Sequence, residues 1–129
     1  MVTMDKKNDS KPSQEFLLKS FDEIIPILKA IGNPGRLKIL ILLWNGPLNF
    51  RTLLDEMDLK KSALANHLTQ LKNTGLIEKI QHGTYCLSDD GEKYIYTIGN
   101  VFKESKKMKM KRKEIEQRKN LTMSFLERK

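Results

Sequence analysis

The chain has 129 residues, 39% of them hydrophobic, which is enough for one modest core with polar tails and too little for two full domains. No apolar run reaches about 18 residues and residues 1–14 are polar, so neither a membrane span nor a secretory signal is expected, and we predict a soluble cytoplasmic protein. The single cysteine excludes an intramolecular disulfide and a thiolate metal cluster. The two histidines are not accompanied by a nucleophile motif. We therefore predict no metal, no cofactor and no enzymatic activity.

The net charge of +8 is concentrated in the C-terminal region. Residues 1–102 carry 13 basic and 12 acidic side chains, whereas residues 103–119 carry nine basic and three acidic ones. Such a run is typical either of a solvated helix face or of an arm that contacts phosphate, and charge alone does not decide between them. We expect three parts: a disordered polar N-terminus (1–13), a folded domain (14–102) and a basic helical tail (103–129).

The first predicted helix follows Ser13, which is a plausible N-cap. Pro26 lies inside this pattern, where its missing N–H and its ring should bend or split the helix. The apolar residues of this helix recur at helical spacing on one stripe: Leu17, Phe21, Ile24, Leu28 and Ile31.

A second predicted helix begins after the Asn33 cap, with Pro34 at its first position. Residues 36–44 are apolar nearly all the way round, so this helix must be covered on more than one side. Residues 48–50 suffice only for a short strand or an extended cap, and Asn49 can cap a third helix. The buried face of that third helix is predicted to contain Leu53, Leu54 and Met57.

The next helix places three leucines on one face and stops at Gly75. Two helices joined by a very short turn indicate a helix-turn-helix. Residues 76–80 and 84–87 are strand-like, and His82-Gly83 between them is a tight-hairpin signal. A last helix, capped by Ser88 or Asp89, should start near Gly91. The predicted fold is mainly α with a small β-hairpin, a winged helix-turn-helix with flanking N- and C-terminal helices.

Residues 32–98 resemble the arsenic-repressor-like (ArsR) winged-helix transcription regulators. The matching segments are GNPGRLKILILL, LNFRTLLDEMDLKKSALANHLTQLKNTGLI and YCLSDDGEKYI, and their order and separation are more specific than any one of them. The resemblance implies a homodimer whose second motif helix enters the major groove of double-stranded DNA. The family's thiolate metal site has no counterpart here, because TLLDEM contains no cysteine.

If Leu64, Leu68 and Leu71 face inward, the opposite face of their helix is available to a DNA groove. Asn66 can pair bidentately with adenine, and lysines can contact phosphate or guanine. Lys60 departs from the family, which usually has a capping hydroxyl there, so Asp58 substitutes as the cap or the turn is looser. With the wing residues, the expected DNA-binding set is Lys60, Lys61, Ser62, Ala65, Asn66, Thr69, Gln70, Lys79, His82 and Thr84.

The apolar surface left over after a winged-helix core is built predicts a homodimer. The alternative is that the first and last helices cover each other within one chain. A second functional hypothesis is a protein-interaction module without specific DNA readout, because residues 32–98 are nearly neutral, with eight basic and seven acidic residues. His67 is interpreted as a packed, hydrogen-bonded histidine. The expected dimer interface comprises Phe21, Ile24, Leu28, Ile41, Trp44, Ile95, Ile98 and Phe102.

Overall fold

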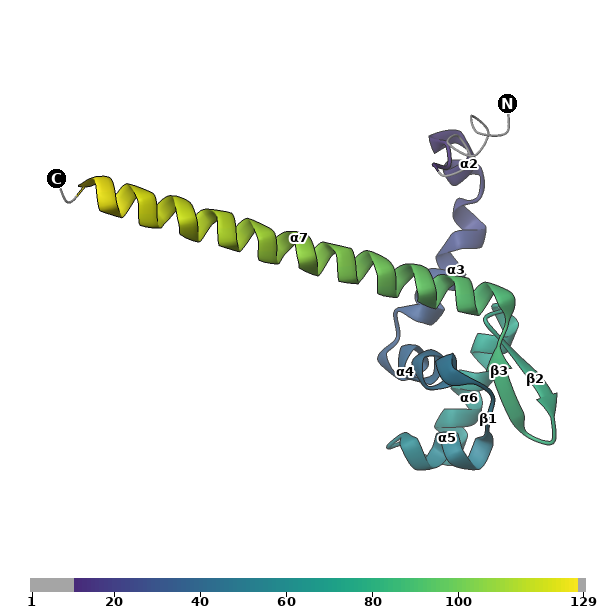
Figure 1. The fold of residues 1–129 in the computed structure, drawn as a ribbon. Helices are drawn as coiled ribbons and strands as arrows, with labels where there is room; N and C mark the ends of the chain where they lie inside the picture. The colour runs from purple at the N-terminus through teal and green to yellow at the C-terminus, as the bar shows by residue number, and fades with distance from the viewer. Residues whose placement is uncertain (1–10, 128–129) are drawn as a thin grey trace. The chain divides into compact units, whose positions relative to one another are not determined.

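The computed structural model describes residues 11–127, which form two compact units that divide between Gly91 and Glu92. The predicted disordered N-terminus therefore lies, up to residue 10, outside the described residues. The first unit contains most of the helices and every strand of the described chain (Figure 1). Its elements are α2 (Gln14–Lys19), α3 (Phe21–Ile31), α4 (Pro34–Leu42), the 3-10 turn η1 (Leu43–Asn45), β1 (Leu48–Asn49), α5 (Phe50–Glu56), α6 (Lys61–Asn73), β2 (Ile77–Gln81) and β3 (Thr84–Leu87).

The second unit consists of one helix. α7 (Asp89–Glu127) begins in the last residues of the first unit and continues without a break through the predicted boundary at residues 102 and 103. None of the helices within residues 11–127 combines the length and the apolar character that a bilayer crossing requires.

Three helices begin at the caps that the sequence predicts. The side-chain oxygens of Ser13, Asn33 and Asn49 accept backbone N–H groups three residues later, at 3.1, 3.1 and 2.8 Å. Each bond satisfies one of the N–H groups that a helix start leaves without an intrahelical partner. These polar side chains therefore fix where α2, α4 and α5 begin.

The predicted first helix is split, but the break is at Ser20 and not at Pro26, which lies inside α3. The expectation of a split at the proline was wrong. Because α3 restarts at Phe21, Pro26 is only its sixth residue, and the hydrogen bond that it removes would have used the carbonyl of Asp22. Asp22 is exposed, so water can hydrate that carbonyl and the helix tolerates the proline.

The core of the first unit lies where α4, α5 and α6 meet the sheet. Leu64, Leu68 and Leu71 of α6 are buried as predicted. Leu53 of α5 and Met57, the residue directly after that helix, are also buried, and Leu54 is half-buried. Burial of each such side chain contributes about 1.5–3 kcal/mol, so this core and not helix propensity stabilises these short helices. The other buried apolar residues are Ala30, Ile31, Ile39, Leu40, Leu43, Leu76, Ile77 and Tyr85.

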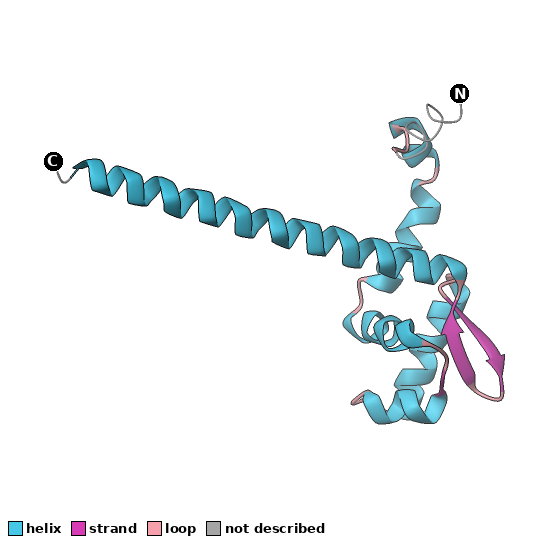
Figure 2. Ribbon diagram, viewed as in Figure 1, coloured by secondary structure: helices cyan, strands magenta, loops and turns pink. Residues whose placement is uncertain are grey.

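The sheet has the strand order β1-β3-β2, with both pairs antiparallel. In Figure 2 the β2–β3 hairpin is the prominent magenta pair. His82 and Gly83 have φ values of 38° and 74°, as a two-residue hairpin turn requires. β2 starts at Ile77, one residue later than predicted, and its register shifts between Lys79 and Gln81. The predicted fold class, a mainly α winged helix-turn-helix with a small hairpin, is confirmed.

The start of α7 is fixed by Ser88, one of the two predicted caps. Its Oγ accepts the Gly91 N–H at 3.0 Å and donates to the Gly75 carbonyl at 2.6 Å, and its own N–H donates to the Leu76 carbonyl at 3.1 Å. One buried hydroxyl therefore ties the first turn of α7 to the segment that joins α6 to β2.

Candidate nucleic-acid interface

The two faces of α6 have opposite characters. Its three leucines are buried, and every residue of the predicted DNA-binding set on or before this helix is exposed. Within residues 11–127 the side chains of Asn66 and Gln70 make no hydrogen bond, so their amide groups remain available to a ligand. The Thr69 hydroxyl donates to the Ala65 carbonyl at 2.9 Å and can therefore act toward a ligand only as an acceptor.

The N-terminus of α6 lacks a side-chain cap. Lys60 occupies the N-cap position with extended backbone angles and provides no capping hydrogen bond, and its carbonyl accepts the first helical bond from Leu64 at 3.0 Å. Of the two predicted alternatives, substitution by Asp58 is not observed. The first N–H groups of the helix therefore add their positive dipole to the exposed Lys60 and Lys61 ammonium groups. This concentration of positive charge suits an anion such as a phosphate.

α6 is held in place by a junction of three helices centred on Arg36. The guanidinium donates to the carbonyls of Ala30 (3.0 Å) and Lys29 (3.3 Å) at the end of α3, and to Nδ1 of His67 on α6 at 3.4 Å. Because arginine can only donate, Nδ1 must be the unprotonated nitrogen of a neutral imidazole. The prediction of a packed, hydrogen-bonded His67 is confirmed.

The packing around this junction also disfavours a charged His67. Burial, and to a smaller extent the positive charge of Arg36, lower the pKa of His67 below its usual value. Gly35 supplies the room for the ring, since a Cβ there would lie 3.0 Å from Nε2 of His67. α4 and α6 therefore meet at a close contact that fixes the position of the exposed face of α6.

The wing is short and anchored at its tip. The Gly83 carbonyl accepts the N–H of Phe50 at 2.8 Å, and Thr84 pairs with Asn49 across β1 and β3. The hairpin tip is thus tied to the start of α5, and His82 is its exposed corner.

The other two wing residues of the predicted set differ in exposure. Lys79 is exposed, and its ammonium lies 6.0 Å from the centroid of the Tyr85 ring, within cation–π range. Thr84 is half-buried, whereas every other residue of the predicted DNA-binding set is exposed, so Thr84 is the least accessible of them.

Arg51 was missed by the sequence reasoning. It lies in the first turn of α5, one residue after the N–H that binds the hairpin tip, and it is exposed. Its ion pair with Asp55 is 3.7 Å long and open to solvent, so it holds the guanidinium only weakly. No local signal in the sequence could have identified it, because its position next to the wing depends on the hydrogen bond between Phe50 and Gly83.

No group of three or more His, Cys, Asp or Glu side chains suited to a metal ion occurs between residues 11 and 127. Cys86 is half-buried on β3, where burial, and then the carboxylate of Glu78, raise the pKa of its thiol. The thiol therefore stays protonated and unreactive at neutral pH.

The predicted dimer residues are mostly exposed in each unit taken by itself. In the first unit Phe21, Leu28, Ile41 and Trp44 are exposed and Ile24 is half-buried. In the second unit Ile98 and Phe102 are exposed and Ile95 is half-buried. Their exposure leaves them available to a partner.

Comparison with known proteins agrees with this architecture. Residues 33–79 match the model of the arsR family of bacterial regulatory proteins. The HTH-type transcriptional regulator MJ1325 of Methanocaldococcus jannaschii, itself uncharacterized, is 33% identical over 85 residues, which are 63% of this chain and 96% of the relative. The structure of HlyU from Vibrio cholerae is similar with a TM-score of 0.59 at 28% identity, over 65% of this chain and 96% of that one.

A more distant structure supports the fold alone. The transcriptional repressor BigR of Xylella fastidiosa is 20% identical and has a TM-score of 0.62, over 70% of this chain and 97% of its own. The length and identity of the match to MJ1325, together with the family model, establish the relationship. The chain belongs to the arsR family of winged-helix transcription regulators.

Proposed function

We propose that the protein binds specific sequences of double-stranded DNA as a homodimer, with α6 in the major groove. The observation that carries the proposal is the contrast between the two faces of α6. One face consists of buried leucines, and the opposite face is exposed and carries the free amides of Asn66 and Gln70. The N-terminus of the helix has no side-chain cap and is flanked by Lys60 and Lys61. Within the helix-turn-helix, this is the arrangement that presents a helix to a groove.

The predicted DNA-binding residues on α6 and at its N-cap have different roles in this proposal. Lys60, Lys61 and the free N–H groups bind phosphate and set the position of the helix. Asn66 and Gln70 have both donor and acceptor atoms free, so they can pair with the N6 and N7 edge of adenine. Ala65 is small and permits close approach of the helix to the bases. Ser62 and Thr69 supply hydroxyl contacts.

The wing contributes mainly to affinity. Its tip carries no arginine, and the bond between Gly83 and Phe50 holds it close to α5, so Lys79, His82 and Thr84 contact the backbone and do not probe the minor groove deeply. Arg51 adds a further phosphate contact from the start of α5. Specificity then resides in α6.

Exposed apolar side chains support the homodimer. Large aromatic and aliphatic residues on α3, on α4 and at the start of α7 are open to solvent in the single chain, and such surface is typical of a subunit interface. A two-fold dimer would place two copies of α6 roughly 34 Å apart, which is one turn of the duplex. The two reading helices then bind half-sites on one face of the DNA.

The competing function is a winged-helix protein-interaction module, favoured by the near-neutral charge of residues 32–98. Selection from random duplexes separates the two hypotheses. DNA binding predicts an enriched sequence and an affinity that falls steeply with salt concentration, because phosphate neutralisation releases counterions. An interaction module predicts neither result.

The roles of individual residues are tested on the selected site. We expect Asn66→Ala to lower affinity for that site about 5- to 150-fold, corresponding to about 1–3 kcal/mol, while leaving random DNA unaffected. Asn73→Ala makes the same chemical change in the last turn of α6 and should have little effect. Lys61→Ala should weaken all duplexes alike and reduce the salt slope by about one. Equal losses from Asn66→Ala and Lys61→Ala on both kinds of DNA would contradict the assigned roles.

A further inference from the structure

The part of α7 beyond residue 102 adds nothing to the core of its unit. Every residue from 96 to 127 is exposed, and the helix of 39 residues is about 58 Å long. Helices without tertiary cover are marginally stable in water. Nearly the whole length of MJ1325 and of HlyU is matched by about two thirds of this chain, so about a third of the chain lies outside the fold that they share.

One side of α7 is polar and basic over five turns. At about 100° per residue, six side chains of residues 106–124 fall within about 80° of the helix circumference: Lys106, Lys109, Lys113, Gln117, Asn120 and Ser124. No carboxylate and no apolar side chain of residues 106–124 lies in this arc. These six residues form the polar stripe, which extends over about 27 Å of the helix axis and carries three positive charges.

The positive charge around the stripe is as dense as the negative charge of a nucleic acid. Residues 106–113 carry six basic and no acidic side chains, which is about one charge per 2 Å of helix axis. Duplex DNA carries one negative charge per about 1.7 Å of its axis. Like charges four residues apart, as in Lys109 and Lys113, destabilise an isolated helix. A polyanion that neutralises them would therefore stabilise this part of α7.

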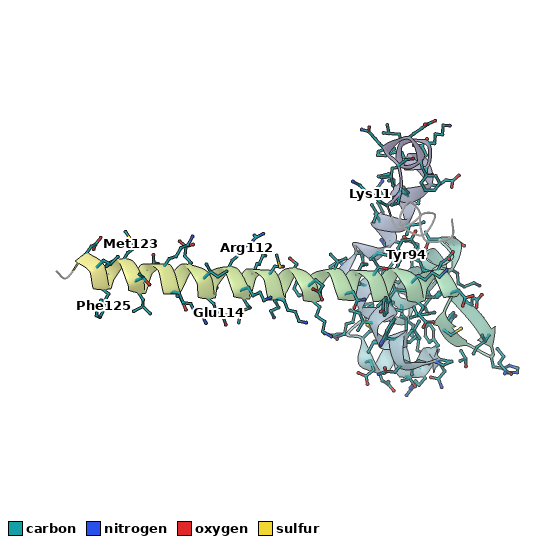
Figure 3. All side chains as sticks on the ribbon, turned by 45° about the horizontal axis from the view of Figure 1, so that its top comes forward. Lys11, Tyr94, Arg112, Glu114, Met123 and Phe125 are labelled. Carbon is teal, nitrogen blue, oxygen red and sulfur yellow. The ribbon has the colours of Figure 1, made fainter. Side chains whose placement is uncertain are left out.

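The distribution of apolar residues disfavours a membrane surface as the anionic partner. A helix that lies in the plane of a membrane needs its apolar side chains on one face. Figure 3 shows that Arg112 and Met123 project from one side of α7, and Glu114 and Phe125 from the opposite side. Because Met123 and Phe125 lie on opposite sides, the distal helix has no such face, and a polyanion in solution fits it better.

We propose that the polar stripe binds the phosphate backbone of the duplex DNA that flanks the site bound by α6. The inference rests on the proposed function and extends its DNA interface beyond the winged helix. The three lysines neutralise phosphates, and the hydroxyl and amide groups of the stripe donate hydrogen bonds to phosphate oxygens. These contacts add affinity without sequence preference.

The length of α7 matches this target. Hydrogen bonds of Ser88 tie the first turn of the helix to the winged-helix unit. Lys106 and Ser124 lie about 26 and 53 Å along the helix axis from Asp89, whereas one turn of the duplex measures roughly 34 Å. DNA held by α6 is therefore at a high effective concentration for the stripe, which favours flanking DNA over a separate molecule.

The proposal is tested by measuring affinity for two duplexes over a range of salt concentrations. One duplex ends at the selected site, and the other continues on one side for about 20 base pairs, or about 68 Å, which exceeds the length of α7. Three phosphate contacts should make the salt slope on the longer duplex more negative by about 3, so its advantage should fall about 40-fold between about 50 and 200 mM salt. Equal slopes would overturn the proposal and leave specific binding of the short duplex by α6 intact. Failure to bind the short duplex specifically would reject the proposed function itself.

Two variants with the same loss of charge separate the stripe from the rest of the helix, and glutamine preserves helix propensity in both. The stripe variant replaces the three lysines of the stripe: Lys106→Gln, Lys109→Gln and Lys113→Gln. The control variant makes the same change on another side of α7: Lys103→Gln, Lys107→Gln and Lys111→Gln. The stripe variant should have equal salt slopes on the two duplexes, and the control variant should keep the difference. Loss of the difference in both variants would overturn the assignment to the stripe.

Trypsin cleavage of the full chain locates the contact, because trypsin cuts after lysine and arginine. The longer duplex should slow cleavage at the three stripe lysines about tenfold relative to the short duplex, since bound lysines are withheld from the protease. Equal protection when a separate duplex is added to the short complex would overturn the flanking contact. Protection by vesicles of anionic lipid, and not by the longer duplex, would overturn the proposal in favour of a membrane surface.

Discussion

Gly91→Ala should destabilise the first unit, although alanine favours helices. A Cβ at Gly91 would lie inside van der Waals contact with the carbonyl group of Leu76, and both partners are backbone, so no flexible side chain can move to relieve the clash. The first turn of α7 must shift, which disrupts three hydrogen bonds around Ser88. At about 1 kcal/mol each, their loss costs about 3 kcal/mol. The helix propensity of alanine offsets about 1 kcal/mol, so the free energy of unfolding should fall by about 2 kcal/mol.

Urea unfolding at one fixed protein concentration measures this change. Gly99→Ala is the matched control, because it makes the same change in the same helix and a Cβ there meets nothing within 4 Å. The control should be unchanged or up to about 1 kcal/mol more stable. If Gly91→Ala were as stable as Gly99→Ala, the close contact between α7 and Leu76 would be refuted.

Three further predictions concern His67, the wing and the dimer. Because the pKa of His67 is lowered in the folded state, the unfolded chain binds more protons as pH falls below about 6.5, and the free energy of unfolding should decrease there. In His67→Gln this decrease should be smaller, and an unchanged pH profile would argue against the junction with Arg36. His82→Asn tolerates the positive φ and should leave base preference unchanged in site selection, whereas an altered preference would show that the wing reads sequence. Phe102→Glu should raise the dimer dissociation constant in sedimentation, and unchanged mass and DNA affinity would count against its place in the interface.

Local signals predicted much of the fold correctly. Asn33 and Asn49 cap helices through side chains that bond N–H groups three residues away, so neighbouring sequence determines those helix starts. The leucine period of α6 identified its buried face, since one helix buries one stripe. The positive φ values at His82 and Gly83 match the hairpin expected for that dipeptide.

The features that the sequence did not predict depend on contacts between distant segments. Arg36 bonds carbonyls of α3 and a histidine 31 residues away, a combination that no local pattern specifies. The requirement for glycine at position 91 comes from Leu76, which lies fifteen residues earlier and on another element. One error has a local cause instead. The predicted split at Pro26 is not observed, because a proline in the early turns of a helix removes a single solvent-exposed hydrogen bond, which α3 tolerates.

The candidate site was predictable only as a set of accessible residues. The exposed face of α6 follows from its leucine period, but the free N–H groups at its start follow from the absence of a cap at Lys60, for which the sequence left two alternatives. Arg51 was missed because nothing in its local pattern places it next to the wing. That position depends on the hydrogen bond between Phe50 and Gly83.

Hydroxyl-radical footprinting on a selected duplex tests the central claim, sequence-specific DNA binding by a dimer, most directly. Two copies of α6 should protect two backbone segments related by a two-fold axis and separated by about one helical turn, roughly 10 base pairs. Lys61→Ala should weaken protection in both segments equally. Protection of a single segment, or no protection at low salt on any selected duplex, would contradict the account.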